Sequence, residues 1–173
     1  MLTKEELDKL TREQLISLLL DDSKNVIAMD GVWFQAIEKE QGMVSAMHFD
    51  EEAWKVYTKV EARRIKKFLG LEEHCGLKGL ERALSYRMVD RPNPSETIIS
   101  GNKLIYTIKV CRVQEARTRK GMPLHPCKSA AVYEYSGFAE TIDDRIKCRC
   151  ISCYPDVTDT SCSCSWEFWI DEE

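Results

Sequence analysis

Apolar residues recur every three to four positions through the first ninety residues, which is the period of an amphipathic helix. Two hydroxyl residues, Thr3 and Thr11, each stand three positions before a carboxylate or amide, the capping-box pattern that begins a helix. The pattern predicts two short helices after these residues, then a helix from Ser23 to about residue 41, one from Asp50 to 69, and one over 77–88. The N-terminal half is therefore expected to be helical.

After residue 94, apolar residues recur at every second position instead of every three to four. Alternation over 104–110 predicts a strand with one buried face, and 97–100 is its expected hairpin partner. Two helices are predicted next, over 113–120 and 126–142, followed by strands over 145–153 and 161–170. This order predicts an α+β fold in which a helical N-terminal half packs with a hairpin–helix–helix–hairpin unit that forms an antiparallel sheet.

A chain of 173 residues suits a single domain. Within 1–173 we expect a helical appendage over 1–21, a helical part over 22–91 and a cysteine-rich sheet part over 95–171. The 25 basic and 29 acidic residues give a net charge of −4, which argues against nucleic acid as a partner. No apolar run approaches the ~18 residues of a membrane span, and the first residues lack the pattern of a signal peptide. A soluble, cytoplasmic protein is expected, and a homodimer stays open.

Five of the eight cysteines fall between residues 147 and 165. A reducing compartment disfavours a disulfide framework, so clustered thiols indicate a metal site or reactivity. Strand alternation brings these cysteines to one sheet face, and Cys150 and Cys164 can share an ion if the register sets them opposite each other. Cys150-x-x-Cys153 adds a chelating pair. The pattern predicts zinc or, as the less favoured alternative, an iron–sulfur cluster; the other interpretation is that these cysteines are small core residues.

Cys127 has a different setting, in the first turn of a predicted helix. Five basic residues and one acidic residue lie between Arg112 and Lys128, and His125 stands two positions upstream. Such a setting lowers a thiol pKa and attracts an anion. Cys127 is therefore a candidate nucleophile with His125 or Glu61 as its base. Arg117 and Lys128 are candidate contacts for a small anionic molecule. The alternative is an inert cysteine on a basic surface.

Two carboxylates fall on apolar helical stripes, where burial is costly without a partner. Asp30 and Glu61 are expected either to form salt bridges with nearby arginines or to line a pocket between the helical half and the sheet. Trp33, on the stripe of Asp30, is a candidate ligand contact in that pocket.

Several motifs together resemble an uncharacterised prokaryotic family of cytosolic proteins. They include Met29-Asp30-Gly31-x-Trp33-Phe34, Cys111-x-Val113-Gln114-x-Ala116-Arg117, Pro126-Cys127-Lys128-Ser129 and Cys150-x-x-Cys153-x-Pro155-Asp156. The family pattern implies Cys111, Cys127, Cys150, Cys153 and Cys164 as the candidate metal ligands. It leaves Cys148 and Cys162 outside the set.

The closing strand, Cys164-x-Trp166-x-Phe168, is distantly similar to the end of aminothiazoline-carboxylate hydrolases and of vinyl-reductase-type small-molecule-binding domains. Both similarities imply a small-ligand pocket between helices and an antiparallel sheet.

Three functional hypotheses follow. The first is a metal-binding protein with a small-molecule pocket. The second is a cysteine-dependent hydrolase of a small amide or heterocyclic acid, in which Cys127 attacks. The third is a thiol-based redox or ligand sensor that pairs Cys150 with Cys164. Whether the protein is an enzyme stays open.

Overall fold

The computed structural model describes residues 3–171. The chain opens with the single-turn helix α1 (Lys4–Leu7) and the long helix α2 (Arg12–Leu69). Both predicted capping boxes are confirmed: the hydroxyls of Thr3 and Thr11 each accept a hydrogen bond from the backbone N–H three residues on.

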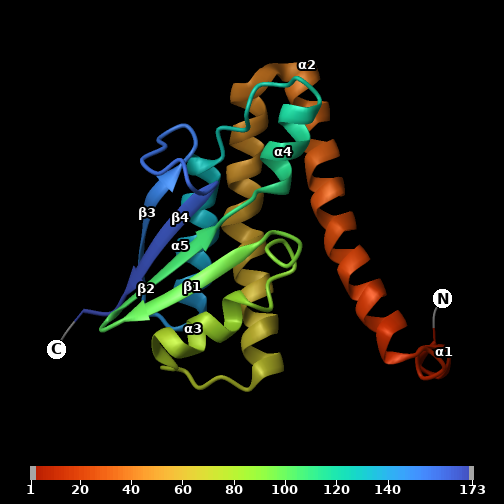
Figure 1. Cartoon of the computed structure of the whole chain (residues 1–173), viewed down its shortest axis with the longest axis vertical. Helices are drawn as coiled ribbons and strands as arrows, with labels where there is room; N and C mark the ends of the chain where they lie inside the picture. The colour runs from red at the N-terminus through yellow and green to blue at the C-terminus, as the bar shows by residue number, and fades with distance from the viewer. Residues whose placement is uncertain (1–2, 172–173) are drawn as a thin grey trace.

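Gly42 divides α2 into two halves. Its φ of 83° lies in a region that only glycine adopts readily, and the two halves run in opposite directions from it (Figure 1). The predicted helix starts at Ser23 and Asp50 are wrong, because both residues lie inside these halves. No glycine or proline turns the chain near them, so the helix continues, and the Ser23 hydroxyl donates to the carbonyl of Leu19.

The remaining elements follow the predicted order. They are α3 (Gly76–Leu84), β1 (Ser95–Ser100), β2 (Lys103–Ile108), α4 (Arg112–Arg119), α5 (Lys128–Ile142), β3 (Lys147–Cys153) and β4 (Cys164–Trp169). Helix α3 ends four residues before the predicted Met88, whose backbone N–H instead donates to the Glu61 carboxylate at 2.8 Å.

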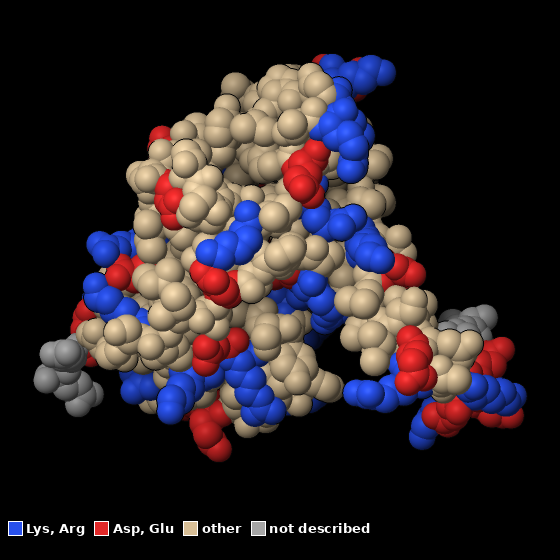
Figure 2. Space-filling model, in the orientation of Figure 1, with Lys and Arg blue, Asp and Glu red and all other residues tan. Residues whose placement is uncertain are grey.

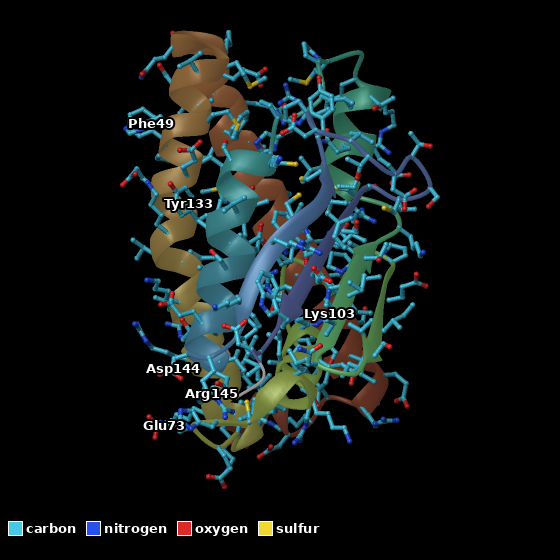
Figure 3. All side chains as sticks on the ribbon, turned by 90° about the vertical axis from the view of Figure 1, so that its left-hand side faces the viewer. Phe49, Glu73, Lys103, Tyr133, Asp144 and Arg145 are labelled. Atoms are coloured by element: carbon cyan, nitrogen blue, oxygen red, sulfur yellow. The ribbon has the colours of Figure 1, made fainter. Side chains whose placement is uncertain are left out.

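The four strands form one antiparallel sheet in the order β1-β2-β4-β3. Helix α5 and the second half of α2 pack together along the sheet (Figures 1 and 3). The main core lies between them, with Trp166 and Phe168 from β4 against Phe138 and Ile142 from α5. The α+β prediction is confirmed.

The register of the last two strands does not set Cys150 opposite Cys164, which was the condition for these two cysteines to share an ion. A β-bulge between Cys150 and Ser152 shifts β3, so that Cys153 lies opposite Cys164 and Cys150 lies opposite Trp166. This one-residue irregularity decides which cysteines meet.

The start of α2 stands away from the sheet-bearing body (Figures 1 and 2). Its leucines and Ile16 are exposed, as are Val32 and Trp33 further along. Further along the same half of α2, Phe34 packs in a small second core with Ala46 and Met47 from the other half of α2.

Within residues 3–171, no helix is both long enough and apolar enough to cross a membrane.

Candidate functional site

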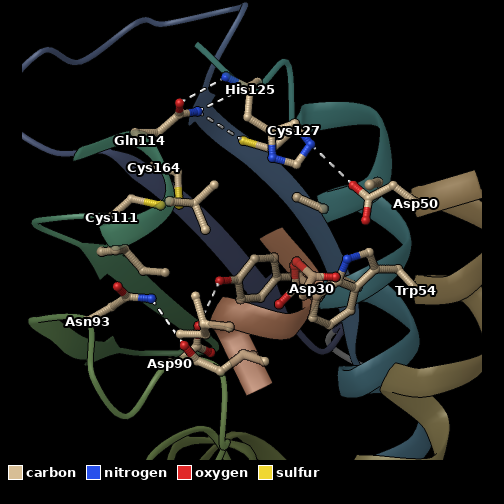
Figure 4. A pocket seen from close by; sticks show the side chains of 18 of the residues that line it. Asp30, Asp50, Trp54, Asp90, Asn93, Cys111, Gln114, His125, Cys127 and Cys164 are labelled. Atoms are coloured by element: carbon tan, nitrogen blue, oxygen red, sulfur yellow. Dashed lines mark hydrogen bonds and ion pairs between the residues drawn. The ribbon is translucent and has the colours of Figure 1, made fainter. Parts of the chain in front are cut away.

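A cavity of about 420 Å³ lies between the two halves of α2, helix α5 and the ends of the sheet strands (Figure 4). The first half of α2 contributes Asp30, the second half contributes Asp50 and Trp54, and α5 contributes Glu134 and Tyr135. The volume is in the range of small-molecule sites, which are ~300–1,000 Å³.

Sulfur atoms gather on one part of the cavity wall. Cys111, Cys127, Cys153 and Cys164 all line the cavity. The Sγ atoms of Cys127 and Cys153 are 3.6 Å apart, and the Cys153 thiol also interacts with the thiols of Cys150 and Cys164. Cys153 is thus the centre of a group of four cysteines, which we call the thiol cluster: Cys127, Cys150, Cys153 and Cys164.

Three elements bring the thiol cluster together. The bulge and register of β3 and β4 set Cys153 beside Cys164. Cys127 directly precedes α5 as its N-cap residue, and the backbone N–H of Lys128 donates to the carbonyl of Tyr154 just beyond β3. The start of α5 is therefore tied to the end of the strand that carries Cys150 and Cys153.

The thiols of the cluster differ in acidity. The hydrogen bond from Cys153 lowers the pKa of Cys127 to about 7; burial opposes this shift, and the nearby His125 supports it. The same donor lowers the pKa of Cys150. The pKa of Cys153 is raised because it is hydrogen-bonded to Cys127, Cys150 and Cys164. The arrangement favours a proton on the central Cys153 and negative charge on Cys127 or Cys150. Outside the cluster, burial raises the pKa of Cys111 to about 12.

Gln114 holds the segment before Cys127. Its side-chain Nε2 donates to the carbonyl of His125 at 2.7 Å and to the Cys127 sulfur at 3.8 Å, and its Oε1 accepts from the His125 N–H at 3.0 Å. The imidazole Nε2 of His125 lies 3.2 Å from the Asp50 carboxylate. Sequence reasoning missed Gln114, although it stands in one of the motifs quoted above, and it assigned Asp50 to a helix cap.

A second polar cluster lies behind the cavity wall. The guanidinium of Arg87 is fully buried and donates to three carboxylates, at 3.2 Å to Glu61, 2.7 Å to Asp90 and 2.5 Å to Glu134. We call these four residues the Arg87 cluster. Burial raises the pKa of Glu134 to about 8 and also raises that of Asp90. Glu61 therefore has a salt-bridge partner, but it is Arg87, which the sequence did not single out.

The structure brings some of the predicted site residues to the cavity. Asp30, His125 and four of the five candidate cysteine ligands line it, and Cys150 lies beside Cys153. Trp33 does not line it, because 66% of its surface is exposed on the outer side of α2.

The two predicted contacts for an anion lie elsewhere. Arg117 is buried in a two-fold hydrogen-bonded ion pair with Glu38, at 2.8 and 2.7 Å, and Lys128 pairs with Asp156 on the surface. Neither lines the cavity. Their charges are compensated by protein carboxylates.

The thiol cluster is more open than a closed zinc site. Zinc–sulfur bonds of ~2.3 Å place tetrahedral ligand atoms roughly 3.8 Å apart, which the Cys127–Cys153 pair matches. Among residues 3–171, only His74, Asp143 and Asp144 place three potential ligand atoms all within 4.8 Å of one another. That group lies at the other end of α5, and Asp143 already accepts hydrogen bonds from Arg145 and the Gly76 N–H.

Comparisons with known proteins agree with the resemblance to an uncharacterised family. No curated protein and no solved structure matches the chain, and the distant similarity to hydrolases and vinyl-reductase-type domains is not shown. The model of a family of unknown function, DUF6125, matches residues 7–170. This match covers nearly the whole chain, which therefore belongs to the DUF6125 family.

Proposed function

We propose that this protein binds a small molecule in its cavity and holds a metal ion, zinc in the first instance, with the thiol cluster on the cavity wall. The observation that carries the proposal is the meeting of Cys153 with three other cysteines from β3, β4 and the start of α5. A cysteine that serves only as a small core residue packs against hydrocarbon. A close pair of sulfurs, Cys127 and Cys153, with Cys150 and Cys164 beside Cys153, is the start of a ligand set for a soft metal.

The acidity of the thiols supports the same conclusion. Metal ligation needs thiolates, so binding displaces protons, and the lowered pKa values of Cys127 and Cys150 reduce the cost of losing them. The proposal requires the side chains of Cys150 and Cys164 to draw in toward the Cys127–Cys153 pair. A bound zinc ion would tie α5 to β3 and β4 and would offer a Lewis acid to the cavity.

Metal analysis tests this proposal. The full chain is purified anaerobically, and its metal content is measured with that of Cys153→Ser and Cys162→Ser. Cys162 is the matched control because it lies outside the thiol cluster, where its sulfur contacts Asp159. We expect about one metal ion per chain in the unchanged protein and in Cys162→Ser, and a large loss in Cys153→Ser.

Folding of each variant is followed by circular dichroism. Substoichiometric metal of every kind in the unchanged protein, with all thiols titrating freely, would contradict the metal proposal. Equal metal content in Cys153→Ser and the unchanged protein would also contradict it.

One observation favours a second candidate, a thiol-dependent hydrolase. Cys127 has a pKa of about 7 and lies on the cavity wall with His125, whose imidazole is beside Asp50. In such a reaction the Cys127 thiolate attacks an amide carbon, the amine leaves with a proton from His125, and water then cleaves the thioester.

Alkylation separates the two candidates. If Cys127 acts as a nucleophile, iodoacetamide modifies it in the protein as purified, with a rate that rises around pH 7. A metal-bound Cys127 is protected until the metal is chelated. Alkylation no faster than that of a model thiol, before and after chelation, would exclude the hydrolase.

A further inference from the structure

The charges on the cavity wall are of one sign. Four carboxylates line the cavity, together with one imidazole: Asp30, Asp50, Asp90, Glu134 and His125. Among the described residues that line it, none is a lysine or an arginine. The cavity is thus an apolar space bordered by acidic groups.

Two of these carboxylates belong to the Arg87 cluster and are only partly neutralised. Asp90 and Glu134 share the single guanidinium of Arg87 with Glu61. One positive charge faces three carboxyl groups, so the cluster has an excess of acid, and the raised pKa values of Asp90 and Glu134 reflect it together with burial. The Arg87 cluster therefore adds no positive charge to the cavity wall.

Within residues 3–171, the other two carboxylates form no salt bridge with an arginine or lysine. Asp50 is only 7% exposed, and its Oδ2 lies 3.2 Å from Nε2 of His125. The contact lacks hydrogen-bond geometry: Oδ2 of Asp50 and Nε2 of His125 both lack a hydrogen bond among the described residues. A buried carboxylate oxygen without a hydrogen bond is costly, and on a cavity wall it is a group that a ligand donor can satisfy.

Asp30 faces Asp50 across the two halves of α2. Its side chain reaches into the cavity (Figure 4). Burial by the surrounding elements, followed by the charge of Asp50, raises the pKa of Asp30 to about 6. Asp30 lines the cavity but is an exposed residue, and the nearby His125 partly offsets the shift. No hydrogen bond or ion pair joins Asp30 to another described side chain, so its carboxylate is open to a positive charge in the cavity.

Aromatic rings complete the wall. Trp54 and Tyr57 pack edge to face at 5.5 Å, and both line the cavity with Tyr135. The hydroxyl oxygen of Tyr57 is buried without a hydrogen-bond partner in the described part of the chain. Aromatic faces attract cations, and a phenol oxygen accepts from an ammonium N–H.

We propose that the cavity binds a small organic cation, an amine or amidine carried on an apolar body. The charged group lies against Asp30 and Asp50, and the apolar body packs against Trp54 and the hydrocarbon of the wall. This proposal rests on the proposed small-molecule function of the cavity and names its ligand class. It replaces the expectation of an anionic ligand, because Arg117 and Lys128 are paired away from the cavity.

Three probes of similar shape and different charge test the proposal. They are phenethylamine, phenethyl alcohol and hydrocinnamate, and binding to the full chain is measured by titration calorimetry. We expect phenethylamine to bind at least about tenfold more tightly than the alcohol, as a charge-assisted hydrogen bond allows. We expect hydrocinnamate to bind most weakly.

Asp30→Asn keeps the shape of the side chain and removes its charge. It should reduce the advantage of phenethylamine over the alcohol about tenfold and leave the binding of the alcohol unchanged. Asp22→Asn, eight residues earlier on the exposed part of the same helix, is the matched control and should change nothing.

Each outcome has a distinct meaning. Equal or tighter binding of the alcohol or the acid, or an unchanged preference in Asp30→Asn, overturns the cation proposal and leaves a ligand-binding cavity standing. Absence of binding by all three probes overturns both the cation proposal and the small-molecule function. The metal content of the thiol cluster is measured separately and does not depend on either result.

Discussion

The Arg87 cluster and the Asp30–Asp50 wall both include carboxylates from α2, and they differ in how the charges of those carboxylates are satisfied. In the Arg87 cluster, every N–H-bearing nitrogen of the guanidinium donates to a carboxylate, and Glu61 also accepts from the backbone of Met88. At the wall, neither Asp30 nor Asp50 pairs with a lysine or arginine of the described part of the chain.

The difference separates a structural role from a binding role. A buried guanidinium with three carboxylates joins α2, α5 and the segment after α3, so removing it leaves buried charge uncompensated. A carboxylate without a partner contributes no such stability. Its presence on a cavity wall is explained when a ligand supplies the missing charge.

Arg87→Met gives the largest expected effect. It leaves Glu61, Asp90 and Glu134 without their shared donor, and we expect the free energy of unfolding to fall by about 3–5 kcal/mol. Urea denaturation followed by circular dichroism measures the change. Arg119→Met, at an exposed position at the end of α4, is the control and should stay within ~0.5 kcal/mol of the unchanged protein. Equal stability of the two variants would refute a structural role for the cluster.

Glu61→Gln should destabilise the protein through the same cluster, but less than Arg87→Met. The amide oxygen still accepts one hydrogen bond, but two charge-assisted bonds, from Arg87 and from the Met88 N–H, are weakened. We expect a loss of about 1.5–3 kcal/mol in the same urea measurement. A loss as large as that of Arg87→Met would mean that Glu61 alone carries the cluster.

Asp30→Asn is expected to change the free energy of unfolding least, and to raise it where the other two variants lower it. The pKa of Asp30 in the folded protein, about 6, is above the ~3.9 of an unfolded chain. The folded state therefore binds more protons between these values, and stability falls as the pH rises from ~4 to ~6. At pH 7 the variant should be more stable by on the order of 1 kcal/mol, after allowance for the exposed part of the side chain.

The same variant should show a flatter dependence of stability on pH across this window. Thermal unfolding at a series of pH values measures it in the absence of any amine. A loss of stability at pH 7 on removing the Asp30 charge would show that Asp30 has a structural partner. It would contradict the claim that the Asp30–Asp50 wall, unlike the Arg87 cluster, has no structural role.

Local signals in the sequence predicted the order of the helices and strands but not every helix boundary. The capping boxes at Thr3 and Thr11, and the change from helical spacing to alternation after residue 94, predicted the order of elements in the structure. The predicted starts at Ser23 and Asp50 failed because a capping residue is only a local preference. Without a glycine or proline beside it, tertiary packing continues the helix through it.

The candidate site could be predicted only in part. The cysteine spacing predicted that thiols would come together; Cys127, Cys153 and Cys164 all line the cavity, and the sulfurs of Cys127 and Cys153 are 3.6 Å apart. Which cysteines lie opposite each other depends on the bulge in β3, and no local pattern in the sequence predicts that bulge. The Arg87 cluster was missed for a related reason: Glu61, the Arg87–Asp90 segment and Glu134 are far apart in the sequence, and only folding reveals that they share one buried space.

The central claim is that the thiol cluster holds a metal ion, and substitution with cobalt tests it most directly. Co²⁺ bound by several thiolates in tetrahedral geometry absorbs strongly in the visible range, whereas octahedral cobalt with oxygen ligands is pale. The account predicts an intense thiolate spectrum that saturates at about one Co²⁺ per chain, persists in Cys162→Ser and is lost in Cys153→Ser. A pale spectrum, or an intense one that survives in Cys153→Ser, would contradict the account.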